Sequence, residues 1–164
     1  MGHSITAIVV KGEFDRAKAD PFDLIGKDVG FGLTLFHIDH YYSACWQYSL
    51  KTQGNLETTN IDSLVFPTEP SIADIVKKIT GNTQAQFAII QTDYFGGIGN
   101  QYANVFIGAA NADKRIKTIN QALKYLGVVP KNGLDEFETT GLHKIREQPD
   151  FLEKYIDLAE QYGI

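Results

Sequence analysis

Three glycines in four positions mark the segment Tyr94-Phe95-Gly96-Gly97-Ile98-Gly99-Asn100-Gln101. Residues 86–93 before it and 102–108 after it are rich in β-forming side chains. This arrangement predicts an antiparallel hairpin whose two strands are joined by an eight-residue connection. Glycine tolerates positive φ and lets other groups approach the backbone closely. We therefore expect an exposed, shaped bend at this point of the chain.

Strand-like segments dominate the sequence before this hairpin. Residues 5–10 are apolar on both faces, as expected of an interior strand, and residues 31–38 predict a second strand. Residues 41–50 contain four aromatic side chains and fit either a strand or a helix. Residues 63–66 predict a short strand that ends before Pro67.

Helical patterns are concentrated later in the chain. Residues 71–80 carry apolar side chains at helical spacing, and Gly81 supplies the stop. We expect a second helix that is capped by Asn111 and ends at Gly127. Its predicted buried stripe comprises Ile116, Ile119, Leu123 and Leu126. Residues 134–141 predict a short helix, and a last helix is expected from Pro149 to Gly163.

The order of these elements predicts an α+β fold. We expect a mostly antiparallel sheet with three to four helices packed on one face, in a single globular domain over residues 1–164. Regular alternation of strands and helices is missing, so a doubly wound parallel sheet is the second choice.

Composition narrows the classes of function. The chain has 164 residues and a formal net charge of -5, and an acidic chain lacks the electrostatic footprint of nucleic-acid binding. Anionic membranes are disfavoured for the same reason. A single cysteine, Cys45, excludes an intramolecular disulfide and a multi-cysteine zinc site. The first apolar run is too short for a membrane span, so the default expectation is a cytoplasmic protein.

The glycine segment is the leading candidate for a binding site. Its glycines match neither a dinucleotide-binding fingerprint nor a P-loop, and a strand instead of a helix is expected to follow. The open alternatives are a purely structural turn and a recognition loop for a protein or ligand. The candidate binding residues are Asp93, Tyr94, Phe95, Gly96, Gly97, Gly99, Asn100 and Gln101.

A second candidate is the run that contains His37, Asp39 and His40. His37 and Asp39 would project from one face of a strand and could supply two ligands to a metal or take part in acid–base catalysis. A third ligand would have to come from a distant residue such as Asp93 or His143. The structural alternative is that Asp39 caps the next segment while His37 makes a buried hydrogen bond.

The function best supported by these patterns is a small protein-binding or self-associating module. It would use the glycine hairpin and the neighbouring aromatic side chains, with a protein partner or a second copy bound there. A metal-dependent or hydrolase-like enzyme using His37 and Asp39 is one alternative. A small-molecule binding module with an aromatic pocket is another. No cofactor is predicted.

Overall fold

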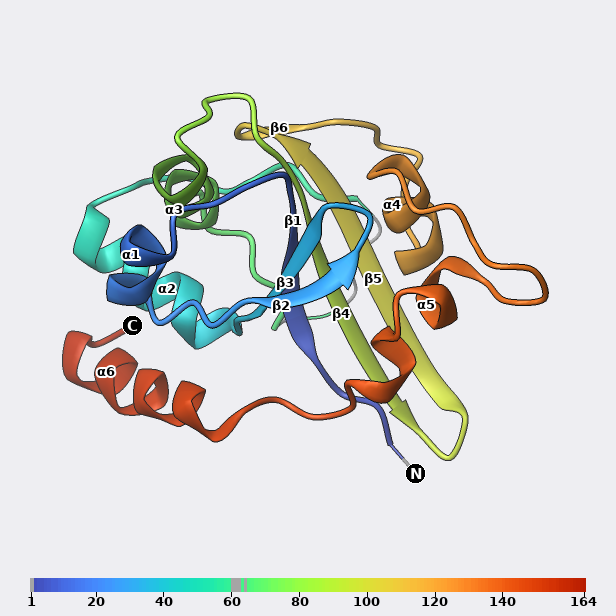
Figure 1. Cartoon of the computed structure of the whole chain (residues 1–164). Helices are drawn as coiled ribbons and strands as arrows, with labels where there is room; N and C mark the ends of the chain where they lie inside the picture. Colours follow the sequence, from blue (N-terminus) through green and yellow to red (C-terminus); the bar gives the residue numbers. More distant parts are fainter. Residues whose placement is uncertain (1, 60–62, 64) are drawn as a thin grey trace.

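The computed structural model describes residues 2–59, 63 and 65–164. Its centre is an antiparallel sheet in the order β2-β3-β1-β4-β5-β6 (Figure 1). The α+β prediction is confirmed, and the parallel alternative is wrong. The strands are β1 (Thr6–Lys11), β2 (Lys27–Gly30), β3 (Leu33–His37), β4 (Gln86–Phe95), β5 (Ile98–Ile107) and β6 (Ala110–Asn111).

The central strand β1 is buried on both of its faces. Ile8 and Val10 belong to one hydrophobic core, and Ala7 and Val9 belong to the other. This alternation places β1 between β3 and β4, as its continuous apolar run predicts. A strand with two apolar faces requires cover on both sides of the sheet.

Helices accordingly pack on both faces of the sheet, which corrects the expectation of one covered face (Figure 1). One face is covered by α1, α2, α3 and α6, and the other by α4, α5 and the turn η2. There are six α-helices in the described residues, more than the three to four expected, because a short helix forms at 16–19 and the ambiguous residues 41–50 are helical. The helices are α1 (Arg16–Ala19), α2 (His40–Leu50), α3 (Ser71–Thr80), α4 (Ile119–Tyr125), α5 (Glu136–Thr139) and α6 (Lys154–Tyr162), with 3-10 turns η1 (Asp20–Phe22), η2 (Leu142–Lys144) and η3 (Asp150–Glu153).

The ambiguous residues 41–50 form the helix α2. Asp39 is its N-cap, because its carboxylate accepts a hydrogen bond from the Tyr42 amide at 2.7 Å. Tyr42 is buried and donates its hydroxyl proton to the carbonyl of Phe22. The aromatic side chains of this segment therefore fix the helix against the core, with Trp46 packed edge-on to Phe22.

The start of α4 lies further along the chain than expected. Its N-cap is Thr118, which forms a capping box with Gln121. Asn111 instead belongs to β6, where it is opposite Phe106. All four residues of the predicted stripe are buried, but only Ile119 and Leu123 lie within the helix, since Ile116 precedes the N-cap and Leu126 is the C-cap.

Other boundaries agree with the sequence to different extents. Helix α3 spans the predicted residues and ends at Gly81, whose φ of 66° is left-handed. The last helix, expected from Pro149 to Gly163, instead consists of the 3-10 turn η3 followed by α6, and its residue Ile156 is exposed. Of the short strand predicted at 63–66, residue 64 lies outside the described residues, and Val65 and Phe66 form a turn and a bend. No helix among the described residues is long and apolar enough to cross a bilayer.

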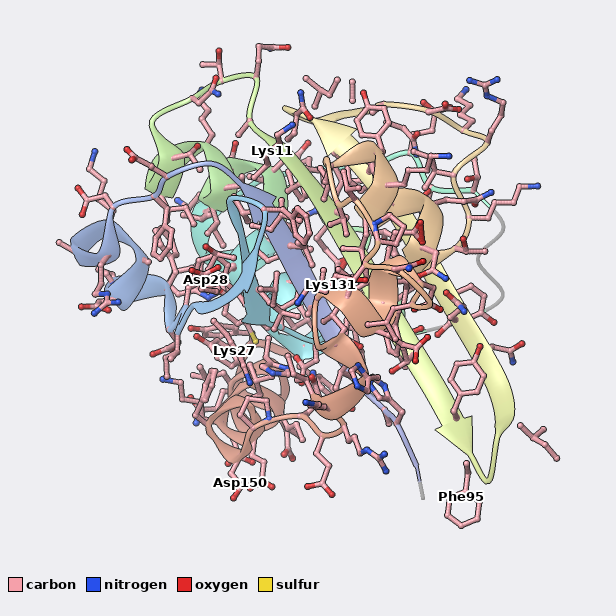
Figure 2. All side chains as sticks on the ribbon, turned by 45° about the vertical axis from the view of Figure 1, so that its right-hand side comes forward. Lys11, Lys27, Asp28, Phe95, Lys131 and Asp150 are labelled. Atoms are coloured by element: carbon pink, nitrogen blue, oxygen red, sulfur yellow. The ribbon has the colours of Figure 1, made fainter. Side chains whose placement is uncertain are left out.

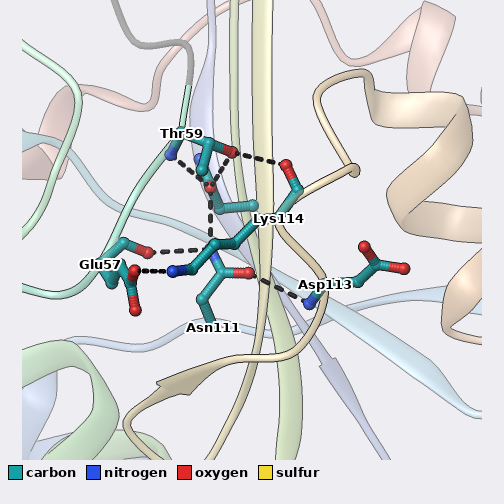
Figure 3. A network of polar contacts seen from close by, with 6 residues as sticks. Glu57, Thr59, Asn111, Asp113 and Lys114 are labelled. Atoms are coloured by element: carbon teal, nitrogen blue, oxygen red, sulfur yellow. Dashed lines mark hydrogen bonds and ion pairs between the residues drawn. The ribbon is translucent and has the colours of Figure 1, made fainter.

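Asn104, a buried polar residue on β5, anchors the long segment that connects α2 to α3. Its side-chain oxygen accepts hydrogen bonds from the Thr59 amide and from the Asn111 side chain (Figure 3). Asn111 also donates to the carbonyl of Glu57, whose carboxylate forms an ion pair with Lys114. This network holds the connecting segment against the end of the sheet near β6.

Candidate functional site

The glycine segment forms a tighter bend than its length predicts. The antiparallel pairing of β4 with β5 continues from Gln86 and Ile107 to Phe95 and Ile98. Only Gly96 and Gly97 remain for the turn, with φ values of 60° and 81°. Two residues with positive φ match the twist of the flanking strands, so two glycines are sufficient. The hairpin itself is as expected, and the eight-residue connection is wrong.

The third glycine has a packing role. Gly99 lies opposite Tyr94 in the ladder, and a Cβ built on it would be 1.9 Å from the carbonyl oxygen of Asp93. Any side chain at this position would collide with the backbone of β4. Gly99 therefore permits the close approach of the two strands near the turn.

The tip of the hairpin exposes two large apolar side chains. Phe95 is 82 % exposed and Ile98 is 83 % exposed, although they are direct cross-strand partners. Phe95 lies at the far end of the hairpin, away from the body of the molecule (Figure 2). Asp93 and Asn100, the next exposed pair, lie opposite each other on the same two strands.

The outer edge of β5 is uncovered close to this tip. Beyond it, β6 pairs with β5 at Phe106 and Ile107, and the Ala103 amide donates to the carbonyl of Lys117. Within residues 2–59, 63 and 65–164, no backbone hydrogen bond reaches this edge between Ile98 and Tyr102.

The direction of the free backbone groups follows from β4. Thr92 and Tyr94 direct their amides away from β5, to the carbonyls of Ile5 and His3. In an antiparallel ladder the residue opposite such a position also points its backbone groups outward. Gln101 and Gly99 are those opposite residues, so their N–H and C=O groups face the open edge.

The other edge of the sheet is protected in comparison. Strand β2 carries the charged residues Lys27 and Asp28 (Figure 2), and its register shifts at a bulge between Asp28 and Gly30. Charges and bulges are the devices by which proteins block strand addition. The segment Ile98-Gly99-Asn100-Gln101-Tyr102 has no charge and no proline.

Tyr94, Gly97 and Gln101 border a cavity on the inner side of the hairpin. The Gln101 side chain accepts a hydrogen bond from the Ile119 amide and donates to the Tyr94 hydroxyl at 3.4 Å. The predicted binding residues thus separate into an exposed tip with Phe95, Gly96 and Asn100, and a cavity wall.

In the second candidate group, His37 and Asp39 form hydrogen bonds with residues that hold the fold together. Gln148 donates its amide N–H to the carbonyl of Ile38, so its oxygen accepts from His37 Nδ1 at 2.9 Å. Burial lowers the pKa of His37 below 6.5, while the hydrogen bond to Gln148 acts in the opposite direction. Asp39 is the N-cap of α2, and burial raises the pKa of its carboxyl.

His40 begins α2, and its ring lies tilted by 37° against that of Tyr41, with ring centroids 4.0 Å apart. Among the described residues, no group of three or more His, Cys, Asp and Glu side chains is arranged to hold a metal ion. The proposed third ligands are elsewhere: Asp93 is exposed near the hairpin tip, and His143 lies in η2. Cys45 is a buried free thiol whose pKa is raised by burial.

Sequence reasoning missed Gln148 and His3, which join distant parts of the chain through side-chain hydrogen bonds. No local pattern distinguishes such residues from ordinary surface side chains. Comparison of the chain with protein-family models, curated proteins and solved structures finds no match.

Proposed function

We propose that the chain is a self-associating module in which a second copy pairs with the open edge of β5. The uncovered backbone of residues 98–102 beside the exposed Ile98 and Phe95 is the observation that carries this proposal. Unpaired strand edges are templates for the addition of another strand. A second copy of the chain offers the same edge.

The edge is self-complementary in an antiparallel arrangement centred on Asn100. Gly99 of each copy then exchanges backbone hydrogen bonds with Gln101 of the other, and both residues face outward in the hairpin. Ile98 comes to lie opposite Tyr102 of the second copy, on one face of the joined sheet. Such a contact is isologous, so it closes as a twofold dimer.

The absence of charged side chains along residues 98–102 favours pairing of two copies through this edge over contact through other parts of their surface. Residues 98–102 are uncharged, whereas the whole chain carries a net charge of -5. General repulsion between copies is screened beyond about 8 Å at physiological ionic strength. An uncharged edge is therefore the region where two acidic copies meet with the least electrostatic opposition.

Sedimentation equilibrium over a range of protein concentrations, in 0.15 M salt (about physiological), tests the proposal. We expect the wild-type chain to dimerise with concentration. Ile98→Lys places a charge on the edge and is expected to give a monomer. Ile25→Lys makes the same chemical change at another exposed isoleucine, 69 % accessible, and is expected to dimerise like the wild type.

Circular dichroism of both variants verifies that the fold is retained. A wild-type chain that stays monomeric at the highest concentration would contradict self-association. Equal dimerisation of Ile98→Lys and wild type would show that another surface is used.

A further inference from the structure

The inner side of the hairpin encloses a cavity that the self-association proposal does not use. Its volume is about 280 Å3, and it is lined by residues of the hairpin, the start of α4 and the N-cap and first turn of α5. Small-molecule sites begin at roughly this size. The lining residues are His3, Thr92, Tyr94, Gly97, Gln101, Ile119, Asn120, Asp135 and Phe137.

His3 forms one wall and has both ring nitrogens engaged by the protein. Its Nε2 lies 2.9 Å from the carbonyl of Leu142, so Nε2 carries the proton and donates. Its Nδ1 lies 2.7 Å from the Thr92 hydroxyl, which donates to it in the neutral ring while accepting from the Ile5 amide. Both ring nitrogens therefore have protein partners, and the imidazole lies next to Phe137 at a centroid distance of 5.3 Å.

Asp135 gives the cavity its charge. One of its carboxylate oxygens caps α5 through the Glu138 amide, and the other accepts from the Asn120 side chain at 3.2 Å. It forms no ion pair with any residue that the structure describes. No lysine or arginine in the part of the chain that the structure describes lines the cavity, and Glu136 follows Asp135 directly in the sequence.

A carboxylate that forms no ion pair with the described residues and lies beside two aromatic rings is an environment that binds organic cations. The negative faces of aromatic rings attract an ammonium group, and the carboxylate adds a direct charge interaction. The rings are those of Tyr94 and Phe137, and the Tyr94 hydroxyl accepts a hydrogen bond from Gln101. We propose that this cavity binds a small organic cation through its ammonium group.

An ammonium group can come from a free metabolite or from a lysine side chain. Two probes separate these sources: choline for a free amine, and N-acetyl-lysine N-methylamide for a side chain. The uncharged isostere of choline, 3,3-dimethylbutan-1-ol, tests whether the charge is recognised. Titrations followed by two-dimensional NMR, at protein concentrations where sedimentation shows a monomer, keep the result independent of dimerisation.

Asp135→Asn removes the charge while keeping a residue that caps helices well. Asp15→Asn is its matched control, because Asp15 caps α1 in the same way on the other face of the sheet. We expect saturable binding of at least one cation, with shifts centred on Tyr94 and Phe137. Asp135→Asn is expected to weaken binding by about tenfold, and Asp15→Asn to leave it unchanged.

Tyr94→Leu removes one aromatic wall and retains the carboxylate, so the proposal stays testable if Asp135→Asn disturbs α5. It is expected to weaken binding of the same probe several-fold. Binding of the lysine derivative alone would assign the source to a protein side chain. The proposal is overturned if neither cation binds at millimolar concentration, if the uncharged isostere binds as tightly as choline, or if Asp135→Asn binds like the wild type.

Discussion

Gln148 accepts a hydrogen bond from the Nδ1–H of His37 across 111 residues of sequence. The same amide oxygen accepts from the Thr6 amide at 3.1 Å, and the amide nitrogen donates to the carbonyl of Ile38. One side chain therefore joins the C-terminal segment to β1 and to the end of β3. His37 is a member of this junction, and its environment has consequences for stability.

The stability of the protein should decrease as the pH falls below about 6.5, and His37 is one cause. Burial lowers the pKa of His37 in the folded state, so the unfolded chain takes up a proton first. The stabilising contribution is complete above 6.5, the ordinary value, and is lost as the pH falls to the folded-state pKa. Urea unfolding at several pH values should show a smaller decrease in His37→Gln. Parallel curves for the two proteins would contradict this role.

Gln148→Ala should destabilise the fold by about 1–3 kcal/mol, because it leaves the Thr6 amide and the Ile38 carbonyl without their partner. Chemical denaturation of the variant measures this loss. Gln84→Ala is a suitable control, since the side chain of Gln84 bonds locally at the surface. Equal stability of the two variants would mean that water replaces the Gln148 contacts.

Gly99→Ala should disturb the hairpin through a steric clash. A Cβ at Gly99 would lie 1.9 Å from the Asp93 oxygen, so the strands must separate, and we expect a loss of about 1–3 kcal/mol. Gly133→Ala measures the cost of backbone strain without a steric clash, because Gly133 has a φ of 81° and open space around it. Its loss should be about 1 kcal/mol. Hydrogen exchange of the β4 and β5 amides should increase in Gly99→Ala and stay unchanged in Gly133→Ala.

Asn104→Ala should be far more harmful than removal of the neighbouring ion pair. Asn104 is fully buried, and its loss leaves the Thr59 amide without an acceptor, with an expected decrease of about 1–3 kcal/mol. Lys114→Ala breaks an exposed ion pair with Glu57 and should change stability by less than about 1 kcal/mol. Thermal unfolding ranks the two variants. A larger effect of Lys114→Ala would contradict the account of this network.

Thr118→Ala should destabilise α4 by about 1 kcal/mol, because Thr118 accepts the hydrogen bond from the Gln121 amide that starts the helix. Thr118→Ser retains the hydroxyl and should behave like the wild type. Chemical denaturation of the three proteins measures the difference. Unchanged stability in Thr118→Ala would place the start of the helix elsewhere.

The sequence predicts correctly those elements whose formation depends on residues within one short segment. The continuous apolar run of β1, the Gly81 stop of α3 and the hairpin around Gly96 are properties of short segments, and the sequence predicts each of them. The Asn111 cap was wrong because an asparagine in a short strand has the same local appearance as a capping asparagine. Which side of the sheet each helix covers is decided by tertiary packing, which no single segment encodes.

The candidate site was predicted in part for the same reason. The hairpin residues were found because glycines are conspicuous in a strand region. His3, Asp135 and Phe137 were missed as a group, since they come from the two ends of the chain and meet only after the sheet has formed. The spacing of His37 and Asp39 is compatible with a metal site or acid–base catalysis. In the structure, however, His37 is hydrogen-bonded to Gln148, and Asp39 accepts a hydrogen bond from the Tyr42 amide.

The central position of β1 has a consequence for biosynthesis. Translation produces this strand before either of its neighbours, and β4 follows only after α1, β2, β3, α2, a long connecting segment and α3. During that interval the edge of β1 that later pairs with β4 has no partner strand in the nascent chain, although β1 is apolar on both faces. Slowing the ribosome between α3 and β4 should therefore increase the dependence of the emerging polypeptide on chaperones.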